Sequence, residues 1–125
     1  MTLRIVHPEC DLSEFDYILG EPATRSWVAG SERLTPTGRK IVGTNPNSYR
    51  AYSIINENTQ VDFADAIESV VGKLEFHKDR INEILDSEGI MELFISVIDT
   101  NGVGDNLHWA LLNRLGFLKV SLSLS

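Results

Sequence analysis

The chain is poor in cysteine and has no long apolar run. Its one cysteine, Cys10, excludes an internal disulfide and a zinc site built from cysteines, and is typical of a protein from a reducing compartment. No apolar run approaches the roughly 20 residues that cross a bilayer. The first eight residues also lack the apolar stretch of a secretory signal. We therefore expect a cytoplasmic protein with no membrane partner.

Basic residues are scarce relative to acidic ones. The chain has 11 lysines and arginines against 18 aspartates and glutamates, and its formal net charge is −7. Such a charge repels nucleic acid, so we expect no nucleic-acid partner. A length of 125 residues suffices for one hydrophobic core. We expect residues 1–125 to form a single α+β domain.

The charge is unevenly distributed along the chain. Residues 51–125 carry twelve acids and five bases, whereas residues 22–50 carry five bases and one acid. The basic segment also contains aromatic residues, prolines and glycines, a combination typical of a functional loop. The residues predicted to bind a ligand or partner are Arg25, Trp27, Arg33, Arg39 and Tyr49. The alternative is a solvated loop whose arginines pair with the acidic half, with Trp27 packing the loop onto the sheet.

Apolar periodicity and turn residues predict the order β-α-β-β-α-β-α-β. Strands are expected where β-favouring or alternating residues gather, and helices where apolar residues recur every three or four positions. The expected elements are a strand at 3–7, a helix at 12–19, a hairpin of 39–42 with 49–55, a helical region at 62–87, a strand at 91–97, a helix at 107–115 and a strand at 120–125. Gly72 favours a break near 72–77 over one long helix. This order predicts an α+β fold with a mixed or mostly antiparallel sheet and helices packed on one face.

No segment matches a catalytic, metal or cofactor motif. The loop at 99–105 lacks the oxygen ligands of a calcium loop and the third glycine of a dinucleotide fingerprint. The three histidines are far apart in sequence. His7 and His108 could still meet near the ends of neighbouring strands and form an acid–base or metal site with nearby aspartates. We expect no catalytic residue, no metal and no cofactor.

The segment 19–30, LGEPATRSWVAG, is the most specific string in the chain. Leu-Gly, a nearby proline and Thr-Arg-Ser-Trp-x-x-Gly resemble the bacterial family named domain of unknown function 4279. A Tyr-Ser strand at Tyr52 and a closing Leu-Gly helix before an alternating strand agree with this resemblance. Pro22 comes one place earlier than in the family pattern, and Tyr52 stands where a tryptophan is common. The resemblance implies a cytoplasmic α+β domain and nothing catalytic, since the family has no established activity.

Two functions are compatible with these features. The leading hypothesis is a protein-recognition module of the immunity or regulatory type, in which residues 51–125 steer a basic partner by charge. The alternative is a small-anion or small-molecule-binding protein, or a minor enzyme, with its pocket under the loop of residues 20–50. The tail strand at 120–125 is uncharged and could pair at a sheet edge to form a homodimer, unless residues 22–50 cover that edge.

Overall fold

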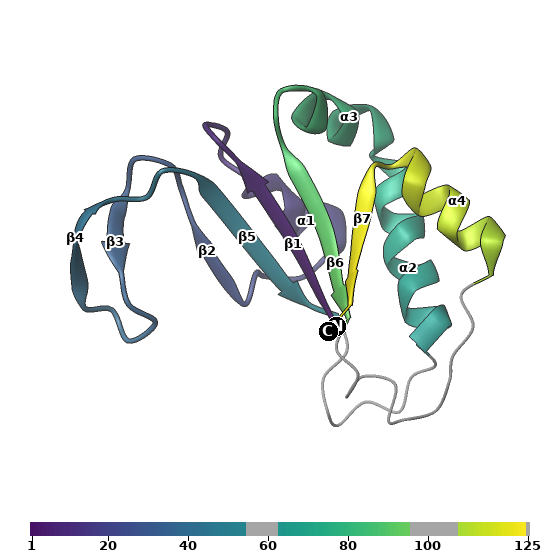
Figure 1. The fold of residues 1–125 in the computed structure, drawn as a ribbon, viewed down its shortest axis with the longest axis horizontal. Coiled ribbons are helices and arrows are strands. Elements are labelled where there is room, and N and C mark those ends of the chain that lie inside the picture. The colour runs from purple at the N-terminus through teal and green to yellow at the C-terminus, as the bar shows by residue number, and fades with distance from the viewer. Residues whose placement is uncertain (55–62, 96–107, 125) are drawn as a thin grey trace.

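The computed structural model describes residues 1–54, 63–95 and 108–124 (Figure 1). Its main sheet has the strand order β2-β5-β1-β6-β7, and a second sheet pairs β3 with β4. The strands are β1 (Thr2–His7), β2 (Arg25–Trp27), β3 (Glu32–Leu34), β4 (Lys40–Thr44), β5 (Ser48–Ser53), β6 (Ile90–Ile95) and β7 (Val120–Leu124), and the helices are α1 (Glu14–Leu19), α2 (Phe63–Phe76), α3 (Lys78–Asp86) and α4 (Trp109–Phe117). Neighbouring strands of the main sheet are antiparallel except β6 and β7. The expected α+β fold with a mostly antiparallel sheet is confirmed.

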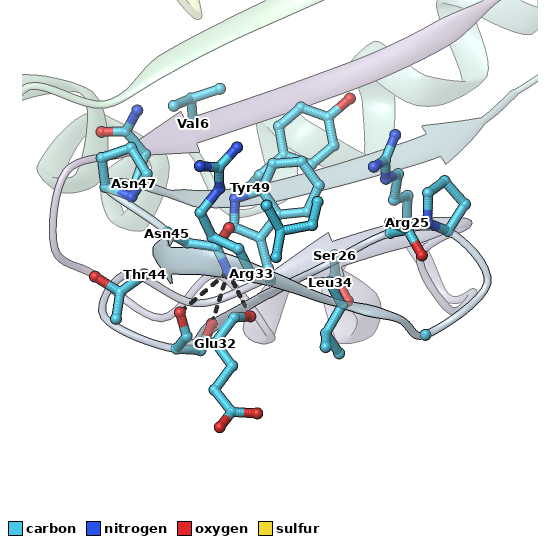
Figure 2. Close-up of a pocket in the computed structure, with 17 residues that line it drawn as sticks. Val6, Arg25, Ser26, Glu32, Arg33, Leu34, Thr44, Asn45, Asn47 and Tyr49 are labelled. Carbon is cyan, nitrogen blue, oxygen red and sulfur yellow. Dashed lines mark hydrogen bonds between the residues drawn. The ribbon is translucent and has the colours of Figure 1, made fainter.

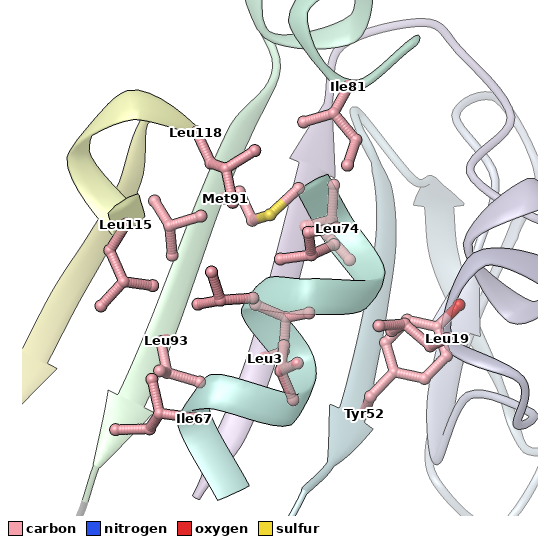
Figure 3. Close-up of a cluster of buried hydrophobic side chains, with 14 of the residues drawn as sticks. Leu3, Leu19, Tyr52, Ile67, Leu74, Ile81, Met91, Leu93, Leu115 and Leu118 are labelled. Carbon is pink, nitrogen blue, oxygen red and sulfur yellow. The ribbon is translucent and has the colours of Figure 1, made fainter. Parts of the chain in front are cut away.

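One face of the main sheet forms the core. Residues paired in register share a face, so Tyr52, Leu3 and Leu93 lie in one row, and Ile5 and Met91 in the next. These five side chains are buried (Figure 3). Buried residues of every helix belong to the same cluster, among them Phe15 of α1, Ile67 and Leu74 of α2, Ile81 and Ile84 of α3, and Leu111 and Leu115 of α4. The helices therefore cover this face, and no helix of the described residues covers the opposite face, which we call the open face.

The helical region is broken within the range that the sequence predicts. α2 ends at Phe76 and α3 begins at Lys78, and between them His77 has φ −116° and ψ 26°, outside the helical region. Gly72 remains inside α2. The His77 ring is half-buried and makes ring contacts with Tyr17 and Phe76. The break redirects the chain so that the apolar side of α3 reaches the same core as α2.

The expected hairpin of 39–42 with 49–55 is wrong. β4 pairs with β3, whereas β5 lies between β1 and β2. The chain reverses earlier, where the Thr35 N–H donates to the Arg39 carbonyl at 2.8 Å and the Gly38 N–H donates to the Thr35 carbonyl at 2.9 Å. The turn-forming residues at 45–47 form a bend between two strands. Sequence reasoning missed β2 and β3 because strands of three residues carry almost no periodic signal.

Gly89 links α3 to β6 at a point where no side chain fits. Its N–H donates to the Ile84 carbonyl at 3.0 Å, and a Cβ at Gly89 would lie 2.5 Å from the same oxygen. Because backbone atoms must then move, we expect Gly89→Ala to lower the free energy of unfolding by about 1–3 kcal/mol in urea denaturation. Gly72→Ala is the matched control, since a Cβ there meets nothing and alanine favours a helix. Equal losses for both variants would contradict this account.

Some sequence expectations fall outside the described residues. The loop at 99–105 is among them. α4 begins at Trp109, and the Nδ1 of His108 caps it by accepting from the Ala110 N–H at 3.2 Å. In the part of the chain that the structure describes, no helix is both long and apolar enough to cross a membrane.

Candidate functional site

The open face of the sheet carries an aromatic stack next to an arginine. In β2 the alternation of side chains puts Arg25 and Trp27 on this face and Ser26 on the other. Register places Tyr49 of β5 beside Trp27 and Val6 of β1 beside Tyr49. The Trp27 and Tyr49 rings are stacked, with centroids 4.4 Å apart and planes at 15°, and the Arg25 guanidinium carbon lies 5.0 Å from the Trp27 ring centroid. The two aromatic residues and the arginine thus form one surface.

Next to this stack the chain bends sharply and forms an arm, defined as residues 32–44. The Gly30 N–H donates to the Asn45 carbonyl at 2.8 Å, and the Asn45 side-chain amide donates to the Ser31 hydroxyl at 3.0 Å and to the Glu32 carbonyl at 3.2 Å. The buried Ser48 hydroxyl accepts from the Ala29 N–H at 2.9 Å. Gly30 has φ +83°, a conformation that favours glycine. These bonds fix the direction of the arm relative to the sheet.

A half-open groove of about 1180 Å³ lies between the arm and the open face. Figure 2 shows its residues, with the side chains of Arg25 and Arg33 flanking the Tyr49 ring in this view. The lining includes Val6, Arg25, Trp27 and Tyr49 from the sheet, Arg33, Leu34 and Ile41 from the arm, and Asn45 and Asn47 from the bend. The groove therefore has an aromatic floor, two guanidinium groups and several amide and hydroxyl groups.

Three arginines of the basic segment have no carboxylate partner among the described residues. These are Arg25, Arg33 and Arg39; Arg33 donates only to the Val42 carbonyl, at 3.4 Å. The other arginines are ion-paired: Arg4 with Glu92, Arg50 with Asp16, Arg80 with Glu14 and Glu83, and Arg114 with Glu68 and Glu75. Arg50 pairs instead with Asp16 and Lys40 with Glu32, and both acids lie outside residues 51–125. Among the described residues, pairing with the acidic half, the alternative that the sequence left open, is found for no base of this segment. It does not apply to the arginines at the groove.

The structure brings four of the five predicted site residues together. Arg25, Trp27, Arg33 and Tyr49 line the groove, whereas Arg39 lies at the tip of the arm and does not line it. Sequence reasoning missed Asn45, which it treated as a turn former. Asn45 both fixes the bend and lines the groove, but nothing in the sequence distinguishes this role from that of any asparagine in a turn.

The arm makes an unusually exposed hairpin. All the residues of β3 and β4 are exposed, and Val42 is 93% exposed. Leu34 and Ile41 are also exposed apolar residues. A two-stranded hairpin is only marginally stable in water by itself, and exposed apolar residues gathered on one feature are typical of interaction sites. The arm therefore presents apolar side chains to solvent.

His7 and His108, which the sequence suggested could form an acid–base or metal site, each have a structural role instead. The buried His7 ring accepts at Nδ1 from the N–H groups of Glu9 and Cys10, at 2.9 and 2.8 Å, and its Nε2 lies 2.9 Å from the Ser87 hydroxyl. Because Nδ1 accepts, the proton lies on Nε2, which donates to Ser87. His108 caps α4. Within the described residues, no group of three or more histidine, cysteine, aspartate or glutamate side chains could hold a metal ion.

A second polar cluster lies on the covered side of the sheet and attaches α1 to β5. Arg50 donates to both carboxylate oxygens of Asp16, at 3.0 and 2.7 Å, and the buried Tyr52 hydroxyl donates to Asp16 at 2.5 Å. The hydrogen bond from Arg50 is the main cause that holds the pKa of Asp16 below its ordinary value. Burial, reinforced by the neighbouring carboxylate, raises the pKa of the Tyr52 hydroxyl, which therefore stays protonated. This cluster has a structural role.

Comparison with known protein families matches residues 1–125 to the family described as a domain of unknown function (DUF4279). The chain belongs to the DUF4279 family. The resemblance seen in the segment 19–30 is thus confirmed, and this segment supplies Arg25 and Trp27 of the groove. No curated protein and no solved structure matches the chain. The family description assigns no activity.

Proposed function

We propose that this DUF4279 protein is a binding module of the immunity or regulatory type, and that its groove holds an acidic segment of a partner protein. The observation that carries this proposal is that Arg25 and Arg33 line the groove without a carboxylate partner among the described residues, although the chain has a large excess of acids. Among the described residues, the contacts of their guanidinium groups are the Trp27 ring for Arg25 and the Val42 carbonyl for Arg33. A partner carboxylate supplies what these two groups lack.

The chemistry of the groove suits a carboxylate on an extended chain. A guanidinium can form two parallel hydrogen bonds to one carboxylate, and such charge-assisted bonds are about twice as strong as neutral ones. The Trp27–Tyr49 stack offers an apolar surface for the methylene groups of a glutamate. The arm adds Leu34 and Ile41 on the opposite wall. A groove of this size that opens to solvent can admit several residues of a peptide.

The net charge of −7 opposes an acidic partner at long range. At physiological ionic strength, however, salt screens exposed charges beyond about 8 Å, so the local charge of the groove determines the contact. Many described acids of the helical side are also neutralised within the chain, by Arg80, Arg114 and Lys119. This pairing favours the groove over the acidic half as the recognition surface.

A small anionic molecule is the second candidate for the groove. Its support is the same pair of guanidinium groups together with the aromatic floor. The groove volume of about 1180 Å³ exceeds the range for small-molecule pockets, roughly 300–1,000 Å³. This comparison favours a peptide segment over a single small molecule.

Titration calorimetry with a decaglutamate peptide tests the proposal, with inorganic phosphate and citrate as parallel small-anion probes. We expect the peptide to bind and Arg25→Ala/Arg33→Ala to weaken it by at least about tenfold, since each charged hydrogen bond contributes about 1.5–3 kcal/mol. The indole N–H signal of Trp27 should shift in the NMR spectrum; Trp109→Phe assigns it, because the chain has two tryptophans.

Lys78→Ala is the matched control, because it removes one exposed positive charge on α3 away from the groove. It should leave the affinity unchanged, and Arg39→Ala should have a smaller effect than the groove variants. Binding of phosphate or citrate without the peptide would replace the proposal by the second candidate. Absence of peptide binding at millimolar concentration, or equal affinity of the double variant, would refute it.

A further inference from the structure

The C-terminal unit formed by α4 and β7 differs in charge from the rest of the chain. Residues 108–124 contain Arg114 and Lys119 and no acid, in a protein whose net charge is −7. Both cations are already paired, Arg114 with Glu68 and Glu75 of α2, and Lys119 with Asp86 of α3. The unit therefore adds no acid of its own to a contact with a second copy of this acidic chain.

β7 is an edge strand with no feature that blocks pairing. It lies at the end of the main sheet, beside β6 alone. Among the described residues, nothing pairs with its outer side, and the basic segment that the sequence offered as a cover belongs to the opposite edge, at β2 (Figure 1). Residues 120–124, VSLSL, include no charge and no proline, and β7 pairs with β6 without a register shift. Natural edge strands normally carry charged residues, prolines, bulges or a covering segment that prevents pairing with another strand.

α4 lies at the β7 end of the molecule (Figure 1) and carries exposed apolar residues. Arg114 points to α2, and at 100° per residue Leu112, Gly116 and Trp109 lie about 140–160° around the helix from it. They therefore occupy the flank that faces away from α2. Trp109 is 71% exposed and Leu112 is 41% exposed. Leu124, at the end of β7, is 76% exposed although it belongs to the row of Ile95, on the covered face.

We propose that two copies of the chain associate through antiparallel pairing of β7 with β7 of the second copy, which joins their main sheets. The pairing is self-complementary about a twofold axis. With Leu122 on the axis, Val120 faces Leu124 of the other copy and serine faces serine, so apolar residues meet apolar residues and no charges are opposed. The free flanks of the two α4 helices then approach each other and cover Leu112 and Trp109.

This interface is independent of the groove. The groove lies at the β2 end of the sheet, and the proposed interface lies at the β7 end. A failure of peptide binding therefore leaves the dimer untouched, and a monomeric protein leaves the groove proposal untouched.

Sedimentation velocity at micromolar concentration in moderate salt tests the dimer. We expect a species of twice the chain mass of 14.0 kDa, and Leu112→Glu/Leu124→Glu should convert it to the monomer. Phe117→Glu is the matched control: Phe117 is 81% exposed on the same helix but only about 60° from Arg114, on the α2 side. This variant should remain dimeric.

A second variant separates loss of association from loss of folding. A Cβ at Gly116 meets nothing within 4 Å, so Gly116→Glu fits the monomer and replaces a poor helix former, yet places a charge on the free flank. It should be monomeric with an unchanged or higher melting temperature. Hydrogen exchange at β7 should also slow as protein concentration rises. A single 14.0 kDa species up to high concentration, or a dimer that survives both flank variants, would overturn the proposal.

Discussion

Replacing Asp16 by asparagine is expected to lower the free energy of unfolding by about 2–3 kcal/mol. Asp16 is the common acceptor for Arg50 and Tyr52, and its loss leaves a guanidinium that is 14% exposed without a counter-charge. Removing one partner of a buried ion pair costs about 3–5 kcal/mol, but the Asp16 side chain is 34% exposed, which reduces the cost. Urea denaturation at neutral pH measures the change directly.

Two variants control for this prediction. Tyr52→Phe removes one hydrogen bond and keeps the ion pair, so it should cost about 1 kcal/mol. Glu9→Ala removes an exposed carboxylate for which no side-chain hydrogen bond or ion pair is found among the described residues, and it should be nearly neutral. If Asp16→Asn costs no more than Glu9→Ala, the cluster does not hold α1 against β5.

The pH dependence of stability gives a second readout of the same carboxylate. In the folded protein the pKa of Asp16 lies below its ordinary value of 3.8, chiefly through the hydrogen bond from Arg50. The unfolded chain therefore binds a proton more readily in acid, so the stabilisation is complete above this ordinary value and is lost as the pH falls through the folded pKa. The difference in stability between wild type and Asp16→Asn should accordingly shrink at low pH. A difference that is constant with pH would exclude an ionic contribution.

The parts of the fold that could be read from the sequence are those with a long periodic signal. The apolar stripe through Ile67, Leu74, Ile81 and Ile84 predicted the helical region, and alternation predicted β7. The tertiary pairing of β5 could not be predicted in this way. Its two neighbours are set by contacts between distant segments, and local turn residues at 45–47 resemble those of a hairpin loop.

The sequence predicted which residues form the candidate site, but it could not predict how their side chains are arranged in space. Charge counting identified the basic segment, and four of its five candidate residues line one groove. The separation of paired from unpaired arginines could not be predicted, because it depends on which face of a strand each arginine occupies. Arg50 lies on the covered face of β5 and reaches Asp16, whereas Tyr49, one position earlier, lies on the open face.

Removing the arm is expected to abolish peptide binding while leaving the body of the protein folded. Glu32 and Thr44 are paired in register, so residues 33–43 can be replaced by an Asn-Gly turn that closes a two-residue hairpin at this pair. The deletion removes Arg33, Leu34 and Ile41 and keeps the hydrogen bonds of the bend through Gly30, Ser31 and Asn45.

Because every residue of β3 and β4 is exposed, the deleted segment contributes little buried apolar area to the core. The free energy of unfolding should therefore change by less than about 1 kcal/mol, within the range of surface changes. Binding of the decaglutamate probe should fall below detection, because one wall of the groove and one of its two guanidinium groups are gone. Unfolding of the shortened chain would show that the arm stabilises the fold. Peptide binding at the wild-type affinity would show that the open face alone recognises the carboxylates, and the arm would then have no part in the proposed function.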